Sequence, residues 1–226
     1  GHIYIRCKYA VVEYDIKKNT FHTIRDNDIQ AITYDNARLW VCTRDSLFTY
    51  NRVEDRLDYY YNLEGVRMSC VTEDSAGNLY VGTMNNGLYM IDHNKKWLNY
   101  FPKKDITCIY EDSKKSIWVG TKDDGLFRLD RNGGITNYGT APHMLSSSYV
   151  RCVVEDNLGN YWIGTFKGLD KLDVTTGTFT HYSKDNKPYS LSNSSIICMM
   201  KDRQGTFWIG TYYGGVNLFN PDYEIY

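Results

Sequence analysis

The sequence predicts an all-β fold, a β-propeller built from four-stranded antiparallel blades. Three observations support this prediction. A unit of about 40 residues recurs along the chain, and each unit holds four short apolar segments separated by turn residues. No segment shows a sustained 3.6-residue apolar period of helical length.

The repeat is anchored by an aromatic residue followed by an apolar residue, Gly and Thr. Good copies occur at Tyr80–Thr83, Trp118–Thr121, Trp162–Thr165 and Trp208–Thr211, and Trp40–Thr43 is a weaker copy with Cys in place of Gly. Upstream of each anchor an apolar run ends in an aspartate. These repeat aspartates are Asp35, Asp74, Asp112, Asp156 and Asp202.

The third unit illustrates the four strands that each repeat predicts. Its apolar segments cover residues 106–110, 117–121, 126–129 and 135–138. Asp, Asn, Gly and Lys fill the turns between them, as short connections between strands require. The first segment of a unit is apolar on both faces, for example at 150–154, which is expected where blades pack face to face.

We expect one propeller region over residues 1–226, with five complete blades and one partial blade. The complete blades are predicted at 28–60, 66–101, 105–138, 148–182 and 194–226, the last ending in a short strand near residues 223–226. Residues 3–24 match the last three strands of an earlier blade. Because closed propellers leave no exposed sheet edges, we expect the chain to be part of a larger, seven-bladed propeller.

Composition excludes several classes of protein. The 226 residues include 26 basic and 27 acidic ones, so the formal net charge is −1. Without a basic cluster, a nucleic-acid partner is not expected. Apolar runs are far shorter than the roughly 20 residues that span a bilayer, and no signal-peptide pattern is visible.

Repeated polar residues are interpreted as scaffold. A Glu precedes the repeat Asp in three units, but a catalytic carboxylate pair is not expected in every blade, so the aspartates are predicted to accept backbone N–H groups in turns. The recurring tryptophans are predicted to be core wedges between blades. Gly87, Gly125, Gly168 and Gly215 are predicted to adopt positive φ before the third strand. No catalytic residues are predicted.

Four cysteines also follow the repeat. Cys70, Cys108, Cys152 and Cys198 each lie four residues before the repeat Asp, and Ala31 holds this place in the first complete blade. A place filled by Cys or Ala is a small-residue site on the inner strand. Disulfides between equivalent positions are not expected, because blades pack at about 10 Å and a disulfide needs Cα atoms within about 7 Å. No C-x-x-C spacing or His partner indicates a metal site, so neither a metal nor another cofactor is predicted.

Variation among the units is the better guide to function, because scaffold residues repeat and site residues need not. The loops between second and third strands differ in every blade and open on the funnel face. Aromatic faces with hydrogen-bonding neighbours suit a carbohydrate, and the Lys and Arg side chains suit an acidic one. The alternative interpretation is ordinary solvated turns. The candidate ligand-binding residues are Arg44, Asn85, Lys122, Asp123, Phe166, Lys167, Tyr212 and Tyr213.

The unit at residues 153–165, with its Asp-x-x-Gly-x-x-Trp-Ile-Gly-Thr pattern, resembles the two-component-regulator propeller repeat, and residues 193–220 resemble another copy. The resemblance implies a periplasmic sensor region of hybrid two-component histidine kinases of Bacteroidetes. Such sensors typically have two seven-bladed propellers and an immunoglobulin-like domain, and many respond to oligosaccharides. This chain has fewer than six complete blades and none of the kinase or response-regulator sequence.

From the resemblance we expect a non-enzymatic sensor that binds an oligosaccharide. The same resemblance implies a periplasmic location within a membrane-anchored parent protein. Expected partners are a second propeller or an immunoglobulin-like domain of the parent chain, and a homodimer is a further alternative. Two alternatives remain: a propeller polysaccharide lyase or glycosidase, which would need an acid/base group found in only one blade, and a protein-interaction scaffold.

Overall fold

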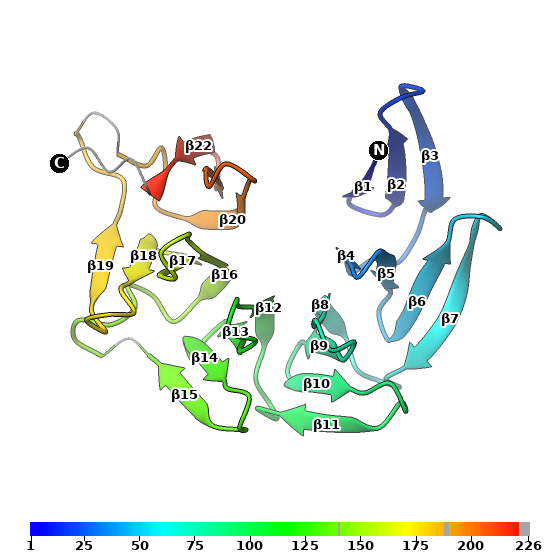
Figure 1. The fold of residues 1–226 in the computed structure, drawn as a ribbon, viewed down its shortest axis with the longest axis horizontal. Helices are drawn as coiled ribbons and strands as arrows, with labels where there is room; N and C mark the ends of the chain where they lie inside the picture. The colour runs from blue at the N-terminus through cyan, green and yellow to red at the C-terminus, as the bar shows by residue number, and fades with distance from the viewer. Residues whose placement is uncertain (140, 188–189, 222–226) are drawn as a thin grey trace. The chain divides into compact units, whose positions relative to one another are not determined.

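The computed structural model describes residues 1–139, 141–187 and 190–221. The chain is an all-β β-propeller of six blades, each a separate antiparallel sheet whose strands follow chain order. It divides into two compact units, Gly1–Ile106 and Thr107–Tyr226. Figure 1 labels the strands where there is room.

The first unit contains three sheets. One is three-stranded and consists of β1 (His2–Arg6), β2 (Val11–Asp15) and β3 (Thr20–Arg25). The next contains β4 (Ala31–Asp35), β5 (Arg38–Cys42), β6 (Ser46–Asn51) and β7 (Arg56–Asn62). The last contains β8 (Met68–Glu73), β9 (Leu79–Thr83), β10 (Leu88–Ile91) and β11 (Trp97–Tyr100).

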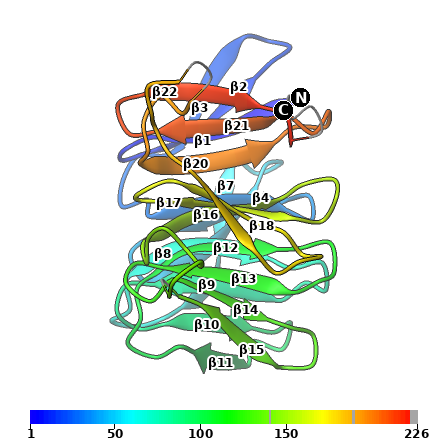
Figure 2. The ribbon, with the colours of Figure 1, turned by 90° about the vertical axis from the view of Figure 1, so that its left-hand side faces the viewer.

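The second unit also contains three sheets. One consists of β12 (Ile106–Glu111), β13 (Ile117–Thr121), β14 (Leu126–Leu129) and β15 (Ile135–Tyr138), which confirms the strands predicted for the third repeat. The next consists of β16 (Val150–Glu155), β17 (Tyr161–Thr165), β18 (Leu169–Leu172) and β19 (Phe179–Tyr182). The last consists of β20 (Ile196–Lys201), β21 (Phe207–Thr211) and β22 (Gly215–Phe219), which lie side by side in Figure 2.

The sheets differ in one detail from the prediction of five complete blades and a partial one. Four sheets have four strands, and the first and last have three among the described residues. The strand predicted near residues 223–226 lies outside the described residues. No helix in the described part of the chain is long and apolar enough to cross a membrane.

The repeat aspartate fixes the turn after the first strand in four blades, as predicted, at Asp74, Asp112, Asp156 and Asp202. The prediction was wrong for Asp35, whose Oδ2 accepts the Thr33 hydroxyl and the Glu73 N–H of the next blade. Asp156 Oδ1 accepts the backbone N–H groups of Leu158 and Asn160, which fixes the turn between the first and second strands. Its Oδ2 accepts the indole N–H of Trp162 at 3.0 Å. The same indole–aspartate bond joins Trp118 to Asp112. One carboxylate therefore holds both the turn and the core tryptophan.

The tryptophans are core wedges where a neighbouring sheet covers them. Trp40, Trp118 and Trp162 are at most 1% exposed. Trp162 packs against Tyr182 of its own sheet and against Phe207 and Phe219 of the next sheet. Trp208 occupies the same repeat position on β21 but is 43% exposed.

Three of the four glycines predicted to adopt positive φ do so: Gly87 at +82°, Gly125 at +80° and Gly215 at +75°. The prediction was wrong for Gly168, which is not among the residues with positive φ. Its loop is one residue shorter than those of Gly87 and Gly125. The Thr165 N–H donates to the Gly168 carbonyl at 2.8 Å, three residues along, whereas Thr121 donates to Gly125, four residues along. Gly168 is needed for another reason: a Cβ there would lie 2.7 Å from the Tyr182 carbonyl oxygen.

The repeat cysteines lie opposite the glycine of the anchor. Cys152 pairs with Gly164 across β16 and β17, and Cys198 pairs with Gly210 across β20 and β21. A Cβ on Gly164 would collide with the Cys152 sulfur. The first complete blade reverses the arrangement, with Ala31 opposite Cys42. Each pair therefore has room for one sulfur atom, and all six cysteines are free thiols.

This packing predicts which thiols react. Burial raises the pKa of Cys70 to about 12 and that of Cys42 and Cys152 well above the usual value, because a thiolate is poorly solvated there. At pH 8 we therefore expect brief iodoacetamide treatment of the folded protein to label the exposed Cys7 and to spare these three, as mapped by mass spectrometry. All should react in urea. Equal labelling of Cys152 and Cys7 in the folded protein would contradict this packing.

Candidate functional site

The eight predicted ligand-binding residues are all exposed and all follow the second strand of a blade. In the first unit, Arg44 donates its backbone N–H to Asp28 Oδ2 at 3.3 Å. Asn85, with φ of +63°, donates its backbone N–H to Asp105 Oδ1. Each loop is thus held by an aspartate, and both side chains are exposed.

In the second unit, the loop after β13 carries Lys122 and Asp123. The Thr121 hydroxyl closes this loop, because it accepts the Asp124 N–H at 3.0 Å and donates to the Gly125 carbonyl at 2.8 Å. The Gly125 N–H at the end of this loop donates to the Ser148 carbonyl at 3.0 Å, in the segment that leads into β16. The loops of the next two blades carry Phe166, Tyr212 and Tyr213. These three residues form a cluster with Arg151.

The loop after β21 exposes two adjacent tyrosines. The rings of Tyr212 and Tyr213 lie 4.3 Å apart between centroids and are tilted by 55°. A hydrogen bond that the Tyr212 hydroxyl makes to Tyr213, together with partial desolvation, raises the pKa of Tyr212, and the charge of Arg151 acts in the opposite direction. Tyr212 therefore lies within electrostatic reach of Arg151.

Tyr213 has an unfavourable backbone conformation. Its φ is +58°, a region that Asn and Gly tolerate and that costs other residues roughly 1–2 kcal/mol. Asn85 occupies the matching loop position in the blade of β8–β11, also with positive φ. The Tyr213 side chain is 92% exposed, so its burial does not compensate for this cost. Strained residues of this kind concentrate at functional sites.

Arg151 lies at the centre of the cluster. Its guanidinium carbon is 4.6 Å from the ring centroid of Tyr149 and 5.2 Å from that of Phe166, within cation–π range of both. The two rings are nearly parallel, with centroids 6.3 Å apart. Arg151 Nη1 donates to Ser195 Oγ at 2.9 Å and to the Ile196 carbonyl at 3.0 Å.

A β-bulge places Arg151 in this position. Val150 pairs with Thr165 and Cys152 pairs with Gly164, so Arg151 is the extra residue on β16. A bulge changes the direction of the side chain that it carries and is frequent near functional sites. The same irregularity recurs in β8 and β20, between Met68 and Cys70 and between Ile196 and Cys198.

The loops that carry Tyr149 and Ser195 are anchored in the same way. Asp170, fully buried on β18, accepts the N–H and hydroxyl of Ser146 and bonds to His181 Nδ1 at 2.8 Å. In the next blade Asn217 accepts the Ser192 N–H and donates to its hydroxyl. These part-buried hydrogen bonds fix the two loops that carry Tyr149 and Ser195.

Arg151 is not among the eight predicted residues, because it lies on the inner strand, whose residues were interpreted as scaffold. A signal was present: the residue before the repeat cysteine is Ser69, Thr107 or Ile197 in other blades and is charged only at Arg151. Thr107 also donates to a neighbouring carbonyl, that of Val150, at 2.6 Å. A small hydroxyl therefore serves the structural role, and the charge at Arg151 is additional.

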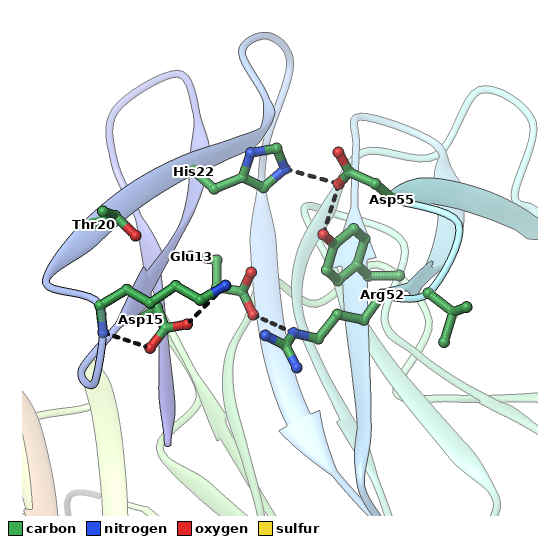
Figure 3. Close-up of a pocket in the computed structure, with 9 residues that line it drawn as sticks. Glu13, Asp15, Thr20, His22, Arg52 and Asp55 are labelled. Atoms are coloured by element: carbon green, nitrogen blue, oxygen red, sulfur yellow. Dashed lines mark hydrogen bonds and ion pairs between the residues drawn. The ribbon is translucent and has the colours of Figure 1, made fainter.

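A second candidate is a cavity of about 510 Å³ in the first unit, between β2, β3 and the β6–β7 hairpin. Figure 3 shows Glu13 facing Arg52 and His22 facing Asp55. Arg52 donates to Glu13 at 2.8 Å, and hydrogen bonds from Tyr50 and His22 lower the pKa of Asp55. The charged residues that line the cavity therefore pair with one another, so none of these lining residues offers an unpaired charge to a ligand. None of the eight predicted residues lines it.

A metal site would need several His, Cys, Asp or Glu side chains close together. Over residues 1–139, 141–187 and 190–221, no group of three or more His, Cys, Asp or Glu side chains is arranged to hold a metal ion.

The repeat and its six sheets define a β-propeller, and comparison with known proteins identifies the repeat. Residues 100–123, 144–167 and 190–213 match the family model described as Two component regulator propeller. The chain therefore carries repeats of this family, which confirms the resemblance found in the sequence. No curated protein matches the chain.

Solved structures share the fold. The extracellular domain of a protein assigned as a hybrid two component system from B. thetaiotaomicron is 26% identical, with a TM-score of 0.81 over 96% of this chain and 31% of that one. A second extracellular domain from this organism, assigned as a one component system, is 20% identical, with a TM-score of 0.80 over the same shares. This chain thus spans about a third of either extracellular domain.

A virginiamycin B lyase from Staphylococcus aureus is also similar, with a TM-score of 0.74 over 100% of this chain and 82% of the lyase. The TM-score shows a common fold, and at 12% identity this likeness does not extend to activity.

Proposed function

We propose that this propeller is the ligand-sensing, extracytoplasmic region of a hybrid two-component system and that it recognises an oligosaccharide. The observation that carries the proposal is the exposed pair Tyr212 and Tyr213 beside Arg151, with Tyr213 held in a strained conformation that burial does not offset. Aromatic faces next to hydrogen-bonding groups are suited to sugar rings. The likeness to an extracellular domain of a hybrid two component system supports the class of protein.

We further propose that the parent protein is membrane-anchored and that this region faces the periplasm. The kinase output would lie elsewhere in the parent. Binding would then shift the packing against a second propeller, an immunoglobulin-like domain or a second copy, because a ligand moves only an equilibrium whose states it binds unequally.

The outer face of β20–β22 supports the proposal of a larger, seven-bladed propeller. Met200, Trp208 and Val216 are 57%, 43% and 63% exposed, whereas the equivalent Val154, Trp162 and Leu169 are at most 7% exposed. Such an apolar face fits a further blade of the same ring. A structure of the parent protein with Trp208 still exposed would refute this.

Calorimetry with a panel of neutral and acidic oligosaccharides tests the sensor proposal. We expect saturable heat with one stoichiometry, and Tyr213→Asn should weaken binding by roughly fivefold or more, because a stacking face is lost. The melting temperature should stay equal or rise, since Asn tolerates positive φ. Tyr9→Ala removes a tyrosine that is 62% exposed in the first unit and serves as the matched control.

The two alternatives correspond to other outcomes of the same experiment. Heat that continues steadily with substrate would mean turnover and would favour a propeller lyase or glycosidase. Absence of heat with every saccharide would contradict the sensor proposal and leave a protein-interaction scaffold.

A further inference from the structure

Arg151 carries a charge that no acidic side chain compensates. Among the described residues its recorded partners are a hydroxyl, a carbonyl and two aromatic rings, and no carboxylate is within ion-pair distance. The residue is half-buried. A partly desolvated cation without a counter-ion is unfavourable, so it is a natural position for an anion from outside the chain.

One edge of the guanidinium is open. Both protein hydrogen bonds use Nη1. Nε and Nη2 have no recorded partner, and neither is among the buried polar atoms that lack one in the described part of the chain, so this edge reaches solvent. Two parallel N–H groups on one edge match the two oxygens of a carboxylate.

Ser195 connects the Nη1 group of the guanidinium to the tyrosine pair. Its hydroxyl accepts from Arg151, and its carbonyl accepts the Tyr212 N–H at 2.9 Å. Phe166 is 51% exposed and donates its backbone N–H to the Tyr149 carbonyl at 3.0 Å. Arg151, Phe166 and the tyrosine pair are therefore neighbours within the second unit.

We propose that Arg151 binds a carboxylate of an acidic oligosaccharide whose sugar ring packs on Tyr212 and Tyr213. This inference rests on the proposed function and specifies its ligand class as one that contains uronic acid residues. Thr107 shows that the inner strand needs only a small donor at this position, so the charge serves the ligand.

The test compares α-1,4-linked trigalacturonate with its methyl ester, which keeps the rings and removes the charge. By calorimetry at low salt, we expect the acid to bind the wild-type protein roughly tenfold tighter than the ester. Added NaCl should reduce this difference. Arg151→Thr, which copies Thr107 and so preserves the fold, should abolish it, and Arg151→Lys should retain part of it.

Equal affinity for acid and ester, or an Arg151→Thr variant that still prefers the acid, would overturn the inference. A sulfated trisaccharide that binds better than trigalacturonate, and does so through Arg151, would overturn the choice of a carboxylate. Binding of neutral saccharides alone would refute the acidic site and leave the proposed function standing. Absence of binding to any saccharide would refute both.

Discussion

Trp162→Ala is expected to lower the free energy of unfolding by about 3–5 kcal/mol, the usual cost of removing a fully buried large aromatic side chain. Trp162 is inaccessible to solvent and contacts rings from its own sheet and the next one, so its loss opens a cavity between two blades. It also leaves Asp156 without the indole N–H that it accepts at 3.0 Å. Urea unfolding followed by far-ultraviolet circular dichroism measures the change.

Trp208→Ala is the matched control for this prediction. Trp208 has the same repeat position and the same indole bond, to Asp202 at 3.0 Å, but it is 43% exposed. Less apolar area returns to water, so we expect less than half the loss found for Trp162. Equal losses for the two variants would show that the indole–aspartate bond, and not burial between blades, determines the contribution of the tryptophan.

The fold could be predicted because its determinants are local. The Asp156 turn and the Trp162 anchor lie six residues apart and recur with Asp112 and Trp118 and with Asp202 and Trp208, so one pattern specifies both the turn and the core position. The exposure of Trp208 could not be predicted in this way. It depends on whether another sheet covers β21, which the repeat itself does not encode.

The candidate site was only partly predictable. Phe166, Tyr212 and Tyr213 stood out because they vary among otherwise similar loops, and the structure places them around or within reach of Arg151. Arg44 and Asn85 belong to the first unit and are outside this cluster.

Arg151 itself escaped notice because its role depends on a bulge. Strict alternation along β16 would assign the residue to a packed face of the blade. The shifted pairing of Val150 and Cys152 with β17 recurs at the same repeat position in β8 and β20, but it becomes visible only in the pairing of the strands.

Gly164→Ala is expected to destabilise the second unit by about 1–3 kcal/mol, the typical cost of overpacking a core. The added Cβ would collide with the Cys152 sulfur and lie 2.6 Å from Ile196 Cγ2. Both neighbours are fixed, one by pairing across the sheet and one by full burial on β20. Gly139→Ala, where a Cβ would meet nothing closer than 3.7 Å, should be nearly neutral in the same urea experiment.

A double-mutant cycle identifies the cause of this cost. Cys152→Ala removes the sulfur, so the combined variant should be more stable than the sum of the two single changes predicts. Rescue should be incomplete, because Ile196 remains in place. The first complete blade shows how an alanine fits opposite a cysteine. Ala31 lies opposite Cys42, and the same buried cluster contains the unbranched Met68. Strict additivity in the cycle would mean that the sulfur is not the obstacle and that the Cys–Gly pairing of the repeat has another origin.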